Sequence, residues 1–285
     1  MATICLPLYY AFVAATLPLD EVLVTPMSLV PGTRLADNVM AALAQRNFGR
    51  QLFNSAVMAT GITVGKLAVS ILSAYAITYF RFPFRNAAFW AIFLTLMVPI
   101  EVRIVPTYAI AANVLGPFQS LMALVGLDAS PGFDLVMKAK WSLLDSYLGL
   151  TLPLIASATA TFLFRQFFLT VPDELLEAAR LDGASPRQFF TDILWPMSRT
   201  NVVALAVIVF IYSWNQYLWP LLITTDNDMT TAVVGMSRLL PGGFSESETR
   251  WNVVMASALL VMLPPVTVVL ALQRWFVKGL VDTDR

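Results

Sequence analysis

Long apolar stretches, separated by short polar ones, run through most of the chain. Because an α-helix rises about 1.5 Å per residue, about 20 apolar residues span the hydrocarbon layer of a bilayer. Apolar stretches of 17 to 29 residues lie at 1 to 17, 52 to 80, 87 to 114, 148 to 169, 201 to 223 and 253 to 273. The pattern predicts an all-α integral membrane protein with six transmembrane helices.

The first stretch is the weakest of these predictions, because it is short and no Lys or Arg precedes it. A signal peptide is one alternative, although such peptides carry positive charge before their apolar run. A start site placed too far downstream would account for the same features. We expect a membrane helix at this position.

Lys and Arg indicate which side of the membrane each polar stretch occupies, because cytoplasmic loops are enriched in them. Nine of these cations occur in 54 residues, at 81 to 86, 165 to 200 and 274 to 285. Seven occur in 94 residues, at 18 to 50, 115 to 147 and 224 to 251. The first set is about twice as dense, so we expect it to be cytoplasmic, together with both termini.

The composition indicates a membrane protein and argues against most kinds of catalytic site. Hydrophobic residues make up 58% of the chain and charged residues 13%, which is about half the charged share of a soluble domain. The chain has no histidine and one cysteine, Cys5, so it lacks the commonest general base, zinc ligand and nucleophile pairs. We expect no catalytic residue, no metal site and no intrachain disulfide, with Cys5 as a small buried side chain.

A polar stretch at residues 172 to 196, PDELLEAARLDGASPRQFFTDILWP, interrupts the apolar pattern. Its opening proline and the two acids that follow favour a helix start, and Gly183 favours the helix end. Ser185 and Pro186 favour the start of a second helix, which Pro196 would end. Helices this short are not stable alone in water, so packing must hold the pair.

The second predicted helix has an apolar face that needs a partner; its members are Phe189, Phe190, Ile193 and Leu194. This face packs either against the chain's own membrane helices or, as a protruding knob, into another protein. A pair of DNA-reading helices is a third possibility. Residues 172 to 199 carry three Arg against five acids, however, and this net negative charge argues against nucleic acid.

The run EAARLDGASPRQFFTDILWP resembles the EAA loop of permease subunits of ATP-binding-cassette importers. The matching residues are Glu177, Ala178, Ala179, Gly183, Ile193 and Pro196. The resemblance continues at residues 74 to 86, 214 to 224 and 273 to 280. It implies a type I importer fold, in which this loop lies between the fourth and fifth helices and docks, through a short coupling helix, in a cleft of a cytoplasmic ATPase subunit.

The same resemblance implies which residues couple the loop to the ATPase: Glu177, Ala178, Ala179, Asp182, Gly183, Phe189, Phe190, Ile193 and Pro196. We expect Glu177 to be a charged anchor at the joint. We expect Phe189, Phe190 and Ile193 to form an apolar plug.

Further partners also follow from the resemblance. We expect a homologous permease subunit as heterodimer partner, two ATPase subunits that bind ATP and Mg, and a periplasmic or lipid-anchored solute-binding protein, all at the bacterial inner membrane in contact with lipid. We expect no cofactor in this chain. GITVGK at residues 61 to 66 has one residue too few between its glycines for a phosphate-binding loop and no Ser or Thr after its lysine. Gly61 and Gly65, four residues apart, instead predict close packing against another helix.

The solute is predicted from a narrower resemblance, to carbohydrate-type importers and among these to importers of sn-glycerol 3-phosphate. It rests on PIEVRIVPT, LTLPLIASATATFLFRQFF and GLVDTD. We expect sn-glycerol 3-phosphate or glycerophosphodiesters, with a neutral sugar or oligosaccharide as the alternative. An ion-driven secondary transporter is less favoured because no internal repeat is evident, and a membrane enzyme because the chain has no histidine.

Three ionisable residues lie inside predicted membrane helices, where charge is costly and often functional: Lys66, Glu101 and Arg103. In one interpretation Lys66 pairs with Glu101. In another, Lys66 or Arg103 lines the transport path and attracts an anionic solute, while Glu101 could also lie at the outer rim and contact a partner. Asn215 and Gln216 are further candidates for the path, although the Trp and Tyr beside them are typical of a membrane-interface belt.

We divide the chain into residues 1 to 49, with the first helix and a periplasmic loop, 50 to 275, the permease core, and 276 to 285, a short cytoplasmic tail. Residues 116 to 145 form a longer external connection than is usual for the family. The polar segment at 240 to 251 is either a solvated loop or, by resemblance, a contact for the solute-binding protein.

Overall fold

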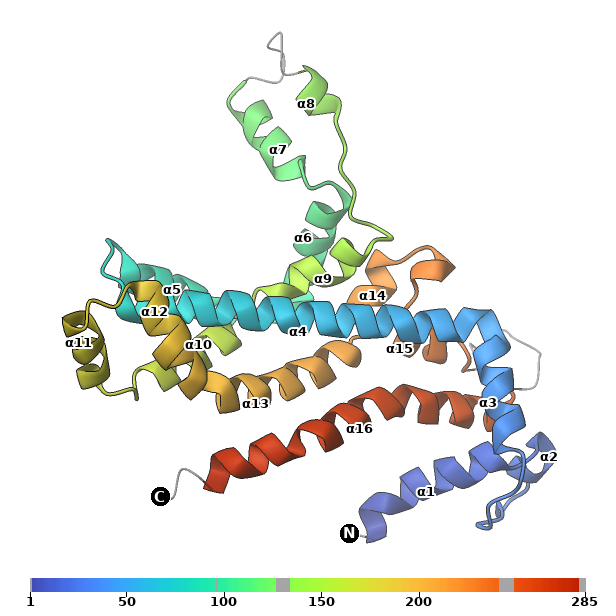
Figure 1. The fold of residues 1–285 in the computed structure, drawn as a ribbon. Coiled ribbons are helices and arrows are strands. Elements are labelled where there is room, and N and C mark those ends of the chain that lie inside the picture. The colour runs from blue at the N-terminus through green and yellow to red at the C-terminus, as the bar shows by residue number, and fades with distance from the viewer. Residues whose placement is uncertain (1, 96, 127–133, 241–248, 282–285) are drawn as a thin grey trace. The chain divides into compact units, whose positions relative to one another are not determined.

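The computed structural model describes residues 2–95, 97–126, 134–240 and 249–281 (Figure 1). In these ranges the chain forms helices and the loops between them, as predicted for an all-α protein. The chain divides into two compact units. One consists of residues 1–58 and 214–270, and the other of residues 59–213 and 271–285.

Small side chains allow the helices of the first unit to lie close together. Its elements are α1 (Ala2–Thr16), α2 (Leu19–Val22), α3 (Leu35–Ala44), η1 (Gln45–Asn47), the start of α4 (Phe48–Tyr79), α14 (Leu218–Ile223), η3 (Asn227–Met229), α15 (Ala232–Ser237) and most of α16 (Trp251–Val281). The core where α1, α3 and α16 meet consists of Ala15, Ala42, Val253 and Ala256.

Buried amides satisfy the backbone groups that the end of α1 leaves without helical partners. The Asn38 Nδ2 donates to the carbonyl of Ala15 at 2.8 Å and to that of Leu17 at 3.0 Å. Its Oδ1 accepts a hydrogen bond from Asn252 Nδ2 at 2.8 Å. This network ties α3 to both α1 and α16.

A similar compensation occurs inside α16, which contains Pro264 and Pro265. Pro265 has no N–H, so the carbonyl of Val261, four residues earlier, cannot form its helical bond. The indole Nε1 of Trp214, a side chain only 1% exposed, donates to this carbonyl at 3.0 Å. The side chain replaces the missing donor, as apolar surroundings require.

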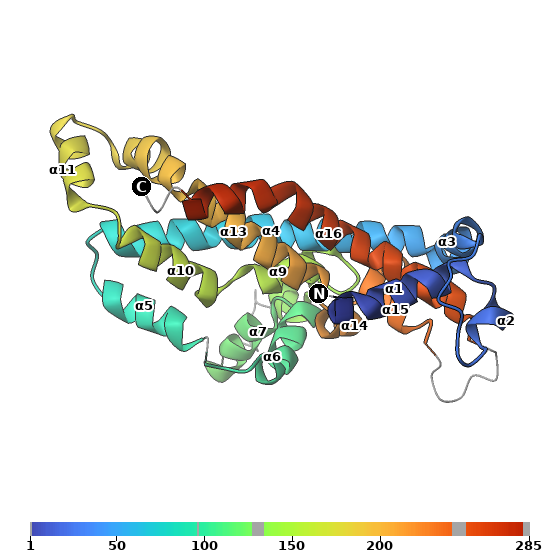
Figure 2. The same ribbon diagram turned by 90° about the horizontal axis from the view of Figure 1, so that it is seen from below.

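The second unit contains the remainder of α4 and the helices of the central sequence. They are α5 (Arg85–Leu94), α6 (Ile100–Ala112), α7 (Gly116–Leu124), α8 (Asp134–Lys138), α9 (Tyr147–Ile155), α10 (Ala158–Phe168), α11 (Asp173–Leu181), α12 (Pro186–Gln188), the π-helix η2 (Phe189–Leu194) and α13 (Trp195–Trp214). Figure 2 shows α5 alongside α10, where Phe93 and Phe162 have ring centroids 5.5 Å apart.

The described part of the long connection at 116 to 145 folds back on α6. The backbone N–H of Leu143 donates to the carbonyl of Ala111 at 2.8 Å, and that of Val114 to the carbonyl of Trp141 at 2.9 Å. Gln119 Nε2 holds α7 to the segment around α8 through the carbonyls of Val136 and Ala139. In Figure 1 α7 and α8 lie beyond the end of α6.

Three described helical segments are long and apolar enough to cross a membrane: Phe48–Tyr79, Pro186–Trp214 and Trp251–Gln273. The pair α9 and α10, bent by 45°, adds a fourth if it counts as one span. The break follows from Ser157, whose extended backbone and side-chain cap begin α10 anew.

Besides the bent α9–α10 pair, which replaces the helix expected over 148 to 169, two more of the predicted spans are wrong as single helices. The helix expected over 87 to 114 is interrupted between Leu94 and Ile100, because Pro99 lacks an N–H and disfavours a helical residue before it. The helix expected over 201 to 223 ends at Trp214, and α14 follows. The first predicted span is the 15-residue α1.

Cys5, predicted to be buried, is exposed on α1. Large apolar side chains are exposed beside it, among them Leu6 and Leu8. In a membrane protein an outward apolar side chain meets lipid tails, which are as apolar as a protein core. An apolar run in a membrane helix therefore does not require that its side chains be buried within the protein.

Close helix packing at Gly61 and Gly65 is confirmed. A Cβ at Gly61 would lie 3.1 Å from Cγ2 of Thr151, and a Cβ at Gly65 would lie 2.6 Å from Cδ1 of Ile155. Both neighbours belong to α9. The two glycines thus form the surface on which α9 lies against α4.

We predict that Gly65→Leu lowers the apparent Tm of the purified protein in detergent by several degrees, because overpacking costs about 1–3 kcal/mol. Adding Ile155→Ala should restore most of the loss, since it removes the atoms that lie in the way. Gly49→Ala is the control, because nothing lies within 4 Å of a Cβ there. An unchanged Tm for Gly65→Leu would contradict this packing.

Candidate functional site

The first helix of the polar stretch, α11, ends in a left-handed turn at Gly183. Its first turn carries two acids, and Pro172 is the N-cap residue directly before the helix. At the other end Gly183 has φ +73°, a conformation that favours glycine. The N–H of Gly183 donates to the carbonyl of Arg180 at 3.1 Å, and that of Ala184 to the carbonyl of Ala179 at 2.9 Å. These two bonds form a Schellman motif, which reverses the chain.

The second helix starts at once, as predicted, with a capping box. Ser185 Oγ accepts from the N–H of Gln188 at 3.3 Å, and the Gln188 side chain accepts from the N–H of Ser185 at 2.8 Å. Pro186 occupies the first helical position. The four-residue turn between the helices is therefore fixed at both ends.

The prediction that Pro196 ends this helix is wrong. α12 passes through the π-helix η2 into α13, and Pro196 is the second residue of α13. In an α-helix the proline ring would clash with the carbonyl four residues earlier. The π-turn before it already shifts the bonding, since the N–H of Trp195 donates to the carbonyl of Phe190, five residues earlier. The helix therefore continues through the proline.

The inner face of the helix pair packs against α4 and α10 of the same unit. The buried residues of this cluster are Ile71, Ala74, Phe164, Phe168, Val171, Ala179, Phe189 and Leu194. Phe190 and Ile193 pack against it and are partly buried. This packing stabilises α11, which is too short to persist alone, and holds it against the start of the continuous helix Pro186–Trp214.

The predicted apolar plug packs in large part within this chain, and its contact with an ATPase subunit stays a prediction. Phe189 is only 3% exposed, and its ring centroid lies 5.3 Å from that of Tyr79 on α4. The ring of Phe190 lies 5.1 Å from that of Tyr75. Phe189 therefore fills the interior of this chain, whereas Phe190 and Ile193 are half-buried and keep part of their surface exposed.

The outer face of α11 is exposed over its whole length. Its members are Glu174, Glu177, Ala178 and Leu181, and their spacing places them on one side of the helix. Leu181 is 89% exposed, so this face combines charged and apolar groups. Asp182 and Gly183 extend this surface. Of the predicted coupling residues, Glu177, Ala178, Asp182 and Gly183 thus lie outside, whereas Ala179 lies inside.

Two tyrosines of α4 bond to the segments around the helix pair. Tyr75 Oη donates to the carbonyl of Pro186 at 2.8 Å, and Tyr79 Oη to the carbonyl of Phe168 at 3.2 Å. Their rings lie 5.5 Å apart. They connect α4 to α12 and to the end of α10.

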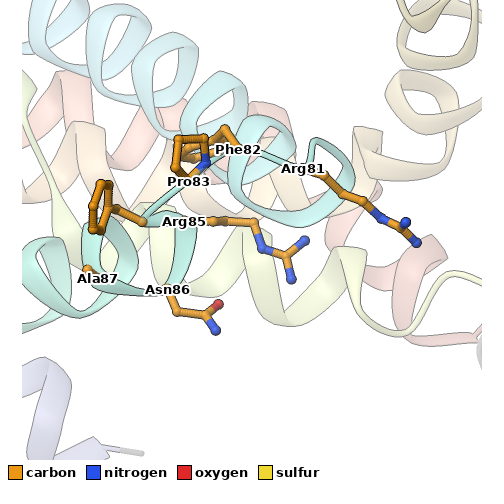
Figure 3. A pocket seen from close by; sticks show the side chains of 7 residues that line it. Arg81, Phe82, Pro83, Arg85, Asn86 and Ala87 are labelled. Atoms are coloured by element: carbon orange, nitrogen blue, oxygen red, sulfur yellow. The ribbon is translucent and has the colours of Figure 1, made fainter.

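The turn between α4 and α5 forms an open pocket of about 650 Å³. Its lining residues are Arg81, Phe82, Pro83, Phe84, Arg85, Asn86 and Ala87. Figure 3 shows the two guanidinium groups extending toward the same side. Phe84 adopts φ +63° and is 82% exposed. This turn therefore presents cationic and aromatic groups together.

The predicted pairing of Lys66 with Glu101 stays a prediction, because the Glu101 side chain lies outside the described part of the structure. Lys66 is half-buried, and its Nζ lies 5.7 Å from the centre of the Tyr212 ring on α13. Arg103 is exposed on α6. In the described ranges no group of three or more His, Cys, Asp or Glu could hold a metal ion.

Asn215 and Gln216 lie in the interruption between α13 and α14, Asn215 exposed and Gln216 half-buried. They belong to the first compact unit, whereas Lys66 and Arg103 belong to the second. The polar segment at 240 to 251 lies mostly outside the described residues, which omit 241–248. Its contact with a binding protein therefore stays a prediction.

Several residues of the site were missed by sequence reasoning. The Arg165 guanidinium lies 4.2 Å from the centre of the Phe89 ring, a cation–π contact within the second unit. Nothing in the sequence singles out Tyr75 or Leu181 either, because a tyrosine in an apolar helix and a leucine in an amphipathic helix are both common. Only their position in the folded chain distinguishes them.

The chain matches a family of transport proteins in sequence and a solved transporter in fold. Residues 66–282 match the family model described as binding-protein-dependent transport system inner membrane component. The solved structure of a bacterial ABC transporter involved in the import of the acidic polysaccharide alginate contains a chain with the same fold, with a TM-score of 0.74 at 18% identity, covering 96% of this chain and 91% of that one.

Curated relatives match over nearly the whole length. The chain is 53% identical to the sn-glycerol-3-phosphate transport system permease protein UgpE of Escherichia coli O1:K1 / APEC, with 100% of this chain and 93% of the relative covered. It is 55% identical to the protein of the same name from Pectobacterium atrosepticum, with 98% and 91% covered.

This chain is therefore a membrane component of an ABC transporter. It belongs to the family of binding-protein-dependent transport system inner membrane components. As a permease subunit it is not the catalytic subunit of the transporter. The family also implies ATPase and binding-protein partners.

Proposed function

We propose that this chain is one of two homologous permease subunits of an importer for sn-glycerol 3-phosphate at the bacterial inner membrane. The observation that carries the proposal is the 53% identity, over 100% of the chain, to a permease named for this solute. Glycerophosphodiesters share the same phosphate chemistry and are the next candidates. The similarity to the alginate importer is at 18% identity and supports the fold alone.

In this proposal the exposed face of α11 docks on one of two cytoplasmic ATPase subunits, which hold ATP and Mg. Glu177 supplies charge and Leu181 supplies apolar contact at that interface. The inner face of the helix pair is already occupied by this chain's own core. Movement of the ATPase subunits would therefore carry the helix pair with α4 and α10, and would alternately open the solute path to either side.

The proposed topology has six membrane crossings with both termini in the cytoplasm. They are α1, α4, the α5–α6 pair, the α9–α10 pair, α13 with α14, and α16. The distribution of Lys and Arg supports this orientation. The turn at Arg81 and Arg85 would then lie at the cytoplasmic surface, where guanidinium groups attract lipid phosphates.

Lys66 and Arg103 are the proposed cations of the solute path. A guanidinium group can bind a phosphate ester through two parallel hydrogen bonds. Arg103 is exposed, so its donors can reach a solute. Glu101, Asn215 and Gln216 remain proposed contacts along the same path.

Changing the charge of the docking face should abolish uptake. We predict that Glu177→Lys and Gly183→Asp each remove more than about nine-tenths of solute uptake, since disrupting a charged contact at an interface costs about 2–5 kcal/mol. A Cβ at Gly183 meets nothing within 4 Å in this chain, so an added side chain would extend into the space of a partner. The φ of +73° also strains any residue other than glycine there, so Glu177→Lys is the more specific of the two variants.

The measurement is uptake of labelled sn-glycerol 3-phosphate by cells with equal amounts of permease in the membrane. Asp37→Lys is the matched control, because it reverses an exposed acid on α3, which belongs to the other compact unit, and should leave uptake unchanged. Normal uptake by both loop variants would refute the docking face.

The solute can be identified from the ATPase activity of the purified transporter. We predict that binding protein loaded with sn-glycerol 3-phosphate stimulates ATP hydrolysis, whereas empty binding protein and protein incubated with a neutral sugar do not. Stimulation by the sugar but not by sn-glycerol 3-phosphate would show that the solute is a neutral sugar and would contradict the proposal. The Glu177→Lys transporter serves as the uncoupled reference.

A further inference from the structure

The first residue of α12 is bonded to a membrane helix far away in the sequence. Tyr75 lies on α4, and its hydroxyl donates to the carbonyl of Pro186 at 2.8 Å across 111 residues of sequence. Pro186 directly follows the capping residue Ser185. The contact therefore lies at the turn that joins the two helices of the pair.

The same carbonyl also accepts a backbone bond. The N–H of Phe189 donates to the carbonyl of Pro186 at the end of α12, and a carbonyl oxygen has a second lone pair. The Tyr75 hydroxyl occupies that second position. The bond can therefore be removed without breaking the helix.

Ring contacts fix the direction of the Tyr75 side chain. Its ring centroid lies 5.1 Å from that of Phe190, 5.5 Å from that of Tyr79 and 5.3 Å from that of Phe80. The Phe80 contact is edge-to-face, with an interplanar angle of 89°, an arrangement that aromatic pairs prefer. Tyr75 thus contacts both α12, through its hydroxyl, and η2, through its ring.

The helix that carries Tyr75 is suited to transmit movement. α4 is 32 residues long and contains no proline, so its backbone bonds are not interrupted in the way proline requires. Two to four turns before Tyr75 it carries Lys66, Gly65 and Gly61. The two glycines contact α9, and Lys66 lies over the Tyr212 ring of α13.

We propose that Tyr75 is a positioning residue that couples the docking helix pair to α4, so that displacement of the pair moves α4 with it. This inference rests on the proposed docking of α11 on an ATPase subunit. Tyr75 itself touches neither ATP nor solute. Its role is to keep the turn at Pro186 and the adjoining π-turn attached to the membrane helix while the ATPase subunits close and open.

Tyr79 provides a matched control on the same helix. Its hydroxyl donates to the carbonyl of Phe168 at the end of α10, and not to the helix pair. Tyr79→Phe and Tyr75→Phe therefore remove the same chemical group from the same helix, one turn apart. They differ in the element that is released.

The test uses the complete transporter, with permeases, ATPase subunits and binding protein, in proteoliposomes. Solute uptake and ATP hydrolysis are measured together, and their ratio is the number of solutes moved per ATP. A general loss of folding lowers both rates, whereas a loss of coupling lowers the ratio.

Tyr75→Phe should lower the ratio about fivefold, the factor that corresponds to one neutral hydrogen bond. Tyr75→Leu, which also removes the ring contacts, should lower it about tenfold or more. Tyr79→Phe should stay within about twofold of the wild type, since the helix pair keeps its bond to α4.

The inference is overturned if both Tyr75 variants transport as many solutes per ATP as the wild type, or if Tyr79→Phe lowers the ratio as much as Tyr75→Phe. Glu177→Lys separates this failure from that of the underlying proposal. If Glu177→Lys stops uptake while the Tyr75 variants are normal, the docking of α11 is supported and the proposed role of Tyr75 is wrong. If Glu177→Lys is also normal, the docking proposal fails.

Discussion

The packing of Ala179, Phe189 and Leu194 against α4 and α10 is the interaction on which the remaining features of the site depend. α11 is not long enough to persist in water by itself, whereas α12 begins a continuous helix that runs to Trp214, so without this core α11 would have no fixed position. With it, the turn at Gly183 is held in place. The face that remains exposed is set by the face that is buried, because side chains on opposite sides of a short helix cannot share one environment.

A second constraint is that backbone groups in an apolar environment need partners. The chain contains prolines within its helices, and each frees a carbonyl. At Pro265 the Trp214 indole supplies the missing donor, and before Pro196 a π-turn shifts the bonding by one residue. At the end of α1 the Asn38 amide serves the same purpose. Polar side chains in these helices thus stabilise the irregular backbone that a transport protein requires.

Helix ends and close packing at glycine were predicted correctly, because they depend on residues that are neighbours in the sequence. Gly183 ends α11, Ser185 begins α12, and Gly61 and Gly65 pack against a helix, because each outcome follows from the properties of one or two residues. The partner of Phe189 could not be predicted, since an apolar face does not specify which apolar surface will cover it. Pro196 was misjudged because a π-turn has no recognisable sequence signal. Tyr75 was missed because its bonding partner is 111 residues away.

The central claim is that the outer face of α11, and not the inner face, contacts the ATPase subunit. Cys5 is the only cysteine, so Cys5→Ser gives a background for single-cysteine labelling. In that background the measurement is cross-linking to the ATPase subunit by a short thiol-to-amine reagent in native membranes, with Leu181→Cys compared to Phe189→Cys. Leu181→Cys should cross-link and Phe189→Cys should not. Cross-linking through Phe189→Cys, with none through Leu181→Cys, would contradict the account.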